Sequence, residues 1–168
     1  MSVYHGSDKK FKIAHPSPTK RIHMENGKRI VDYEGISLHS TFTKWIALAY
    51  TGKRIKYVDK GKIQYFNFGV HLKSKNNKLF IHKNVIISGK RSLEYSLNKL
   101  YGDGGYLYTF NGNKFKWVKG LGENEVISYD AQVPTKIEYI KNPVKEMKKL
   151  GVTFMFINTI NNKNLLIK

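Results

Sequence analysis

One carboxylate, Glu125, stands where a glycine-containing loop leads into an alternating run of apolar and polar residues, GENEVISYDAQV. Alternation with a period of two is typical of a half-buried strand, and Gly120 and Gly122 make the preceding loop supple. A carboxylate held at the start of a rigid strand is well placed to act on a ligand. The common alternative is a solvated acid at a strand end, so chemistry can be assigned to Glu125 only if other residues support it.

The familiar nucleotide, hydrolase and metal motifs are missing from the sequence. The two glycine-rich stretches, GDGG and GLGEN, do not have GxGxxG spacing, and neither GxxxxGK[ST] nor GxSxG occurs. The six histidines form no HExxH or HxxxH pair, and the chain has no cysteine for thiolate ligands or disulfide bonds. We therefore expect no metal cofactor.

The composition indicates a folded, strongly basic protein. A net charge of +18 over 168 residues favours a polyanionic partner, although only four of the 30 basic residues are arginine, the side chain that best grips phosphate. Hydrophobic residues make up 40% of the chain, too many for a disordered protein. We expect one domain over residues 1–168, without a signal peptide or membrane segment, and a monomer in the cytoplasm.

Strands dominate the expected secondary structure. Strands are predicted over Ser2–Ser7 and residues 35–41, 62–73, 79–82, 85–87, 106–110, 114–118, 125–133, 136–140 and 152–157. Helices are predicted over residues 44–51, 92–100 and 143–150, the first with Thr43 as its N-cap. Residues 8–31, with two prolines and scattered charges, are expected to form a long functional loop. This order predicts an α+β fold without alternating βαβ units.

Two further residues accompany Glu125 in a recognisable order. His5 ends the first predicted strand within YHGS, and Tyr50 lies on the helix after the second strand. This order resembles the ADP-ribosyltransferase superfamily, in the His–Tyr–Glu branch that includes the diphtheria-toxin type and the poly(ADP-ribose) polymerase catalytic domain. The likeness is carried by YHGS, GISLHSTFTKWIALAY and NEVISYDAQV, short motifs that together extend over nearly the whole chain. It implies a split β-sheet core and NAD as co-substrate.

The resemblance also implies a role for each matched residue. Glu125 would stabilise the oxocarbenium-like state formed when the nicotinamide–ribose bond breaks. Tyr50 would stack on the nicotinamide ring. The backbone of Gly6 would pair with the carboxamide, its missing side chain allowing close approach, while His5 and Ser7 would bond ribose hydroxyls.

Three more residues complete the expected site. Arg21, in the predicted loop, is a candidate for the pyrophosphate, because its guanidinium fork suits phosphate. The polymerase branch usually presents a second aromatic on the second strand, where this chain has Ser37 and His39. Either His39 replaces this aromatic or the nicotinamide is held differently. Glu123 is similar to the first acid of the ExE motif in the superfamily's Arg–Ser–Glu branch, which makes it a candidate acid on the acceptor side.

The expected activity is mono-ADP-ribosyl transfer from NAD to a nucleic acid or a nucleic-acid-bound protein, by a phage or toxin effector acting in the cytoplasm of a host cell. One alternative is an NAD glycohydrolase on the same fold, with water as the acceptor. Another is a non-enzymatic nucleic-acid-binding module. Its basic patch would consist of Lys53, Arg54, Lys56, Lys60 and Lys62, with Tyr57 between them.

Overall fold

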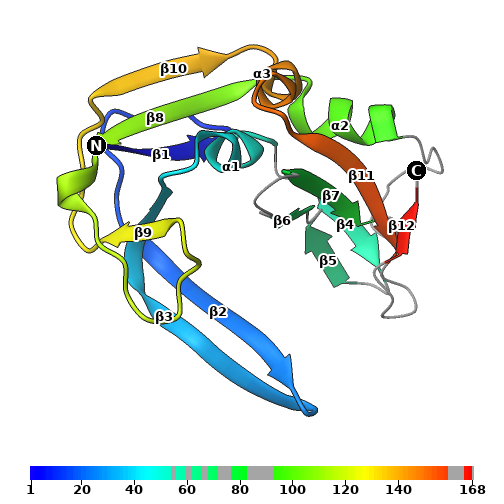
Figure 1. Ribbon diagram of the computed structural model, residues 1–168, viewed down its shortest axis with the longest axis horizontal. Helices are drawn as coiled ribbons and strands as arrows, with labels where there is room; N and C mark the ends of the chain where they lie inside the picture. The colour runs from blue at the N-terminus through cyan, green and yellow to red at the C-terminus, as the bar shows by residue number, and fades with distance from the viewer. Residues whose placement is uncertain are drawn as a thin grey trace.

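The computed structural model describes residues 1–53, 56–59, 62–65, 68–71, 77–82, 93–158 and 165–167. These residues form a small mixed α/β structure of mostly antiparallel strands with a few short helices (Figure 1). The predicted α+β class is confirmed at this coarse level. No helix in the described part of the chain is long and apolar enough to cross a membrane.

The larger sheet follows the strand order β10-β8-β1-β3-β2, and β9 also pairs with β3. Its strands are β1 (Ser2–Ser7), β2 (Ser17–Glu25), β3 (Lys28–Thr41), β8 (Gly105–Asn111), β9 (Glu125–Ser128) and β10 (Lys136–Ile140). All of these pairings are antiparallel. β1 meets β3 at Tyr4 and Thr41, and β3 then leads away from β1 (Figure 1). The sheet therefore opens between these two strands.

A second sheet has the order β12-β11-β7-β6, and two further strands form a separate pair. These strands are β4 (Lys56–Asp59), β5 (Lys62–Tyr65), β6 (Phe68–His71), β7 (Lys78–His82), β11 (Thr153–Asn158) and β12 (Leu165–Ile167). The pairing of β11 with β7 is parallel. The helices are α1 (Lys44–Ala49), α2 (Leu93–Tyr101), α3 (Pro143–Lys149) and a 3₁₀ turn, η2 (Gly112–Lys114).

Helix α1 is fixed on several sides by the largest apolar cluster. Its Trp45 and Leu48 are buried with Leu100 of α2 and Met147 of α3. The hydroxyl of Tyr101 also donates a hydrogen bond of 2.8 Å to the carbonyl oxygen of Ala49. A short helix has little stability of its own, so tertiary packing determines its position. The end of α1 is consequently a rigid point in the fold.

The prediction of a loop over residues 8–31 is wrong beyond residue 16, because β2 and β3 form a long hairpin. Asn26 and Gly27 connect the strands and have φ values of 51° and 75°. An Asn-Gly pair with two positive φ angles is the preferred two-residue hairpin turn. The hairpin extends away from the rest of the molecule (Figure 1). The NG dipeptide was the sequence signal that this prediction missed.

Three other strand predictions need correction. The strand predicted over 125–133 ends at Ser128, whose hydroxyl accepts hydrogen bonds from the backbone of Asp130 (3.2 Å) and the side chain of Gln132 (2.9 Å) and so turns the chain. Residues 62–73 contain two strands, β5 and β6, which belong to different sheets. Residues 114–118 form no strand and make one isolated bridge, between Lys116 and Ile127.

The three predicted helices are present, each within about two residues of its predicted end. Thr43 occupies the N-cap of α1 as predicted, but its side chain makes no capping hydrogen bond. The predicted strand 85–87 lies outside the described residues.

The packing of β1 against α1 predicts that Gly6 cannot be replaced. A Cβ added at Gly6 would lie 1.8 Å from the carbonyl oxygen of Ala47, so Gly6→Ala should lower the free energy of unfolding by about 1–3 kcal/mol or more. Gly122→Ala is the matched control, because its Cβ would have its nearest contact at 3.7 Å. Chemical denaturation of both variants measures the difference. Equal stabilities would contradict this account of the packing.

Candidate active site

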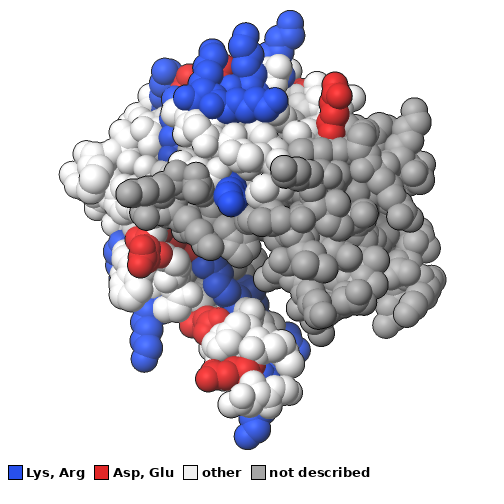
Figure 2. Space-filling model, turned by 45° about the vertical axis from the view of Figure 1, so that its right-hand side comes forward, with Lys and Arg blue, Asp and Glu red and all other residues white. Residues whose placement is uncertain are grey.

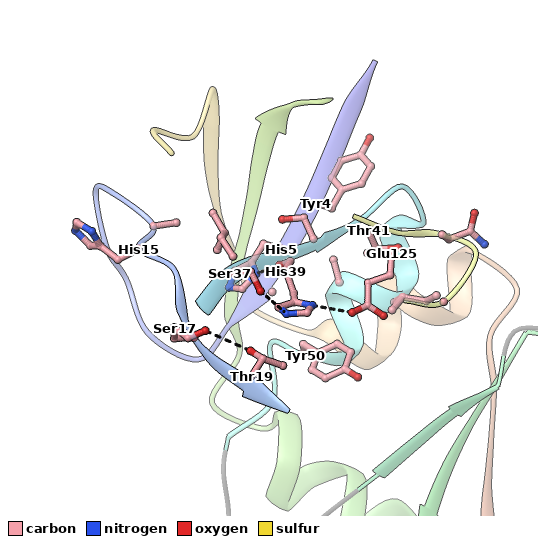
Figure 3. Close-up of a pocket in the computed structure, with 18 of the residues that line it drawn as sticks. Tyr4, His5, His15, Ser17, Thr19, Ser37, His39, Thr41, Tyr50 and Glu125 are labelled. Atoms are coloured by element: carbon pink, nitrogen blue, oxygen red, sulfur yellow. Dashed lines mark hydrogen bonds and ion pairs between the residues drawn. The ribbon is translucent and has the colours of Figure 1, made fainter. Parts of the chain in front are cut away.

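A cavity of about 1070 Å³ opens where β1 and β3 diverge (Figure 3). Its walls come from β1, the segment between β1 and β2, β2, β3, α1 and the residue after it, and the loop that leads into β9. This volume is at the upper end of the range for small-molecule sites. The opening of the larger sheet therefore creates a space that can hold a ligand larger than a single sugar or base.

The cavity collects nearly all of the residues that the sequence singled out. The predicted residues that line it are His5, Gly6, Arg21, His39, Tyr50, Glu123 and Glu125. Ser7 is not among the lining residues, and its hydroxyl accepts a hydrogen bond of 3.1 Å from the backbone N–H of Lys9, in the turn after β1. The structure thus gives Ser7 a local turn contact, and its contact with a ligand stays a prediction.

Glu125 is held by two basic side chains from different strands. Nδ1 of His39 donates to Oε1 at 2.7 Å, and Nη2 of Arg21 donates to the same oxygen at 2.8 Å. Nη1 of Arg21 donates to Oε2, which makes the guanidinium–carboxylate pair bidentate. Strand β3 supplies His39 and strand β2 supplies Arg21. Both oxygens of the carboxylate therefore have a defined orientation.

These contacts decide the charge of Glu125. Its side chain is 20% exposed, and burial alone would raise its pKa. The hydrogen bonds from His39 and Arg21, together with the positive charge of Arg21, outweigh burial and lower the pKa to about 2. The carboxyl group of Glu125 is therefore ionised throughout the neutral pH range.

A chain of buried hydroxyl groups supports His39 from the other side. Nε2 of His39 lies 3.0 Å from the hydroxyl of Ser37, which lies 2.8 Å from the hydroxyl of Tyr33. Ser37 is 1% exposed and Tyr33 is 8% exposed. Buried polar groups are costly unless they are hydrogen-bonded, so this chain favours a single orientation of the imidazole. The edge of the Tyr33 ring also meets the His39 ring, with 5.5 Å between centroids.

The sequence did not predict the contact of His39 with Glu125 or the part played by Tyr33. The ring of His39 binds Glu125 in the structure, and its replacement of a stacking aromatic stays a prediction. Tyr33 was missed because the strand was predicted to begin only at residue 35. Alternate residues of a strand point to one face, and the spacing of Tyr33, Ser37 and His39 could have revealed this shared face.

His5 joins the two halves of the opened sheet. Its Nδ1–H donates a hydrogen bond of 2.7 Å to the carbonyl oxygen of His39. Burial lowers the pKa of His5, and the neutral form then carries its lone pair on Nε2. His5 can therefore accept a hydrogen bond from a hydroxyl group in the cavity.

Gly6 and Tyr50 owe their places to helix α1. The side of Gly6 that lacks a side chain faces Ala47, so packing against α1 alone requires a glycine here, and the pairing of its backbone with a ligand stays a prediction. Tyr50 is the C-cap of α1, and its side chain remains 56% exposed at the cavity. Figure 3 shows the Tyr50 ring beside the pair formed by His39 and Glu125. An aromatic ring thus lies near the carboxylate.

Comparisons of the chain with protein-family models, with curated proteins and with solved structures found no match. Among the described residues, no group of three or more His, Asp or Glu side chains is arranged to hold a metal ion. The assignment of the site therefore depends on the geometry of its own residues.

The ion pair predicts a measurable titration. Arg21→Gln should raise the pKa of Glu125 from about 2 toward its ordinary value of 4.5, because the guanidinium charge and two hydrogen bonds are lost. Ionised Glu125 stabilises the fold fully above pH 4.5, and this contribution is lost as the pH falls to about 2. Carboxyl carbon chemical shifts followed by NMR measure the pKa directly.

Lys20→Gln is the control for this titration, because it removes the same charge from the neighbouring position of β2. Lys20 lies 3.9 Å from Glu34 and is not a partner of Glu125. A Glu125 pKa that is unchanged in Arg21→Gln, or raised equally in Lys20→Gln, would show that Arg21 does not govern this carboxylate.

Proposed function

We propose that this protein is an NAD-dependent mono-ADP-ribosyltransferase with an ADP-ribosyltransferase-like split sheet. The observation that carries the proposal is the convergence of His5, Tyr50 and Glu125 on one cavity, with Glu125 ionised. These residues are separated by 45 and 75 positions in the sequence, so their meeting depends on the fold. A carboxylate, an aromatic ring and a hydroxyl-binding histidine are the groups needed to bind and break a nicotinamide riboside.

The topology supports this proposal at the level of the fold. The larger sheet divides at the single register pair of Tyr4 and Thr41 into a β10-β8-β1 part and a β2-β3-β9 part. His5 comes from the first part and Glu125 from the second. A ligand bound in the opening would contact both parts, as expected for a split sheet that holds NAD between its halves.

The proposed reaction breaks the bond between C1 of the ribose and the nicotinamide nitrogen. The bonding electrons leave with nicotinamide, and the positive charge on the ribose is stabilised by the carboxylate of Glu125. A nucleophilic oxygen or nitrogen of the acceptor then forms a bond to C1 and gives up a proton. Nε2 of His5 accepts a hydrogen bond from a ribose hydroxyl, and the Tyr50 ring stacks on nicotinamide.

Arg21 has two partners in this proposal. In the structure it pairs with Glu125, and with NAD present it would pair with the pyrophosphate. A ribose hydroxyl would then replace Arg21 as the partner of the Glu125 carboxylate. Arg21 and Glu125 would change partners together, so neither charge is left without a partner.

The acceptor is proposed to be a nucleic acid or a nucleic-acid-bound protein, because the net charge of +18 favours a polyanion. Glu123 lines the cavity in the loop before Glu125, where an incoming acceptor would arrive. Transfer of ADP-ribose to water instead would make the protein an NAD glycohydrolase. An experiment with labelled NAD distinguishes the two activities, because the label ends on a macromolecule in one and on free ADP-ribose in the other.

Glu125→Gln should lower the rate of nicotinamide release from NAD roughly 10²- to 10³-fold, because the neutral amide cannot balance the positive charge on the ribose. Glu138→Gln is the matched control, because Glu138 lies on β10 outside the cavity and pairs with Lys136 at 3.4 Å. Chromatography of the released nicotinamide measures both rates. Full activity in Glu125→Gln would remove the basis of the proposed function.

Incubation with biotin-labelled NAD and a cell lysate, followed by nuclease or protease treatment, identifies the acceptor. We expect the label on macromolecules, and label found only on free ADP-ribose would favour the glycohydrolase.

A further inference from the structure

Trp117 is a large aromatic side chain that the core does not use. It is 55% exposed, whereas its neighbours Phe115 and Leu121 are 9% and 8% exposed and pack into two apolar clusters. The indole N–H of Trp117 donates a hydrogen bond of 3.1 Å to the carbonyl oxygen of Gly122. Gly122 lines the cavity, three residues before Glu125. The indole ring is therefore fixed in solvent next to the rim of the active site.

A second exposed ring lies next to this segment. Tyr129, which follows β9, is 51% exposed, and the ammonium group of Lys116 lies 4.8 Å from the centroid of its ring. Lys116 is the neighbour of Trp117 in the chain, and its backbone pairs with Ile127 through hydrogen bonds of 2.9 Å and 2.8 Å. Lys116 therefore lies over one exposed ring and is the neighbour in the chain of the other.

The charge of this segment has one sign. Lys114, Lys116 and Lys119 are exposed, and residues 113–122 contain no acid. We define the aromatic strip as Lys114, Lys116, Trp117, Lys119 and Tyr129. Exposed rings interleaved with lysines suit a single strand of nucleic acid, whose unpaired bases stack on the rings while its phosphates meet the ammonium groups. A duplex keeps its bases paired and stacked on one another, and cannot use the rings in this way.

We propose that the aromatic strip binds single-stranded nucleic acid and delivers it to the mouth of the cavity. Stacking and phosphate pairing do not require a 2′-hydroxyl, so the strip accepts DNA and RNA strands alike. Delivery as an ADP-ribosyl acceptor rests on the proposed function, whereas binding to the strip does not.

The lysines of α3 provide an internal comparison. Lysine and arginine side chains gather on the upper face of the molecule in Figure 2. Lys145, Lys148 and Lys149 of α3 are exposed. Helix α3 packs against α1 and α2, and Figure 1 shows it well apart from β9. A Lys→Glu substitution in α3 changes the net charge as much as one in the aromatic strip. Comparing the two variants therefore shows whether strand binding depends on where the lysine lies.

The test uses a short oligothymidylate, the matching oligouridylate and a duplex, without NAD. The chain has two tryptophans, and Trp45 is only 3% exposed, so quenching of tryptophan fluorescence by an added strand reports stacking on Trp117. We expect quenching by both single strands and much less by the duplex. Fluorescence anisotropy of labelled strands measures the affinity.

Two pairs of variants complete the test. Trp117→Ala should weaken binding roughly tenfold, and Trp117→Phe should retain most of the affinity because a ring remains. Lys116→Glu should weaken binding and reduce the slope of affinity against salt by about one, whereas Lys148→Glu should have a smaller effect. Circular dichroism checks that each variant is folded.

The proposal is overturned if single strands leave the fluorescence unchanged, if the duplex binds as well as they do, or if Lys148→Glu weakens binding as much as Lys116→Glu. Glu125→Gln separates the two proposals, because it should bind strands normally while releasing nicotinamide roughly 10²- to 10³-fold more slowly. Strand binding by a wild-type protein that does not cleave NAD would contradict the proposed function alone. NAD cleavage without strand binding would contradict the aromatic strip alone.

Discussion

The site depends on keeping one carboxylate charged in a place where burial opposes the charge. Glu125 remains ionised because β2 and β3 bring Arg21 and His39 to both of its oxygens. Strand β9 pairs with β3 in the register of Glu125 with Thr41. The same β3 pairs with β2, so a slip in either register would separate the acid from its bases. The contacts of Glu125 with Arg21 and His39 therefore depend on these strand pairings.

The buried hydroxyl chain explains why His39 can hold this position. Ser37 and Tyr33 are removed from water, and each would be costly without a partner. Together they satisfy one another and the far nitrogen of His39, whose near nitrogen binds Glu125. The polar groups form one connected series from the interior of β3 to the cavity. A series of this kind favours one arrangement over many, and so preorganises the carboxylate before a ligand arrives.

The sequence predicted the helices, most strands and seven of the 22 residues that line the cavity. The types of these residues indicate possible chemistry, and the elements that hold them have clear local patterns. In α1, for example, the apolar residues Trp45 and Leu48 form the buried side. The partners of Glu125 were predicted less well. The link between Arg21 and Glu125 spans 104 residues, and no local period encodes it. Likewise, the hydroxyl of Ser128 ends β9 early, where the alternation of YDAQV alone favours a longer strand.

The bidentate pair of Arg21 and Glu125 bears on how a ligand would enter. Glu125 is 20% exposed and Arg21 is 41% exposed, so the pair mainly offsets the cost of removing the carboxylate from water. A ligand with hydroxyl groups at one point and a diphosphate at another satisfies both members at once. A purely anionic ligand would satisfy Arg21 but repel Glu125, and a purely hydroxylic ligand would leave Arg21 unbalanced. The co-substrate proposed above, NAD, carries both kinds of group.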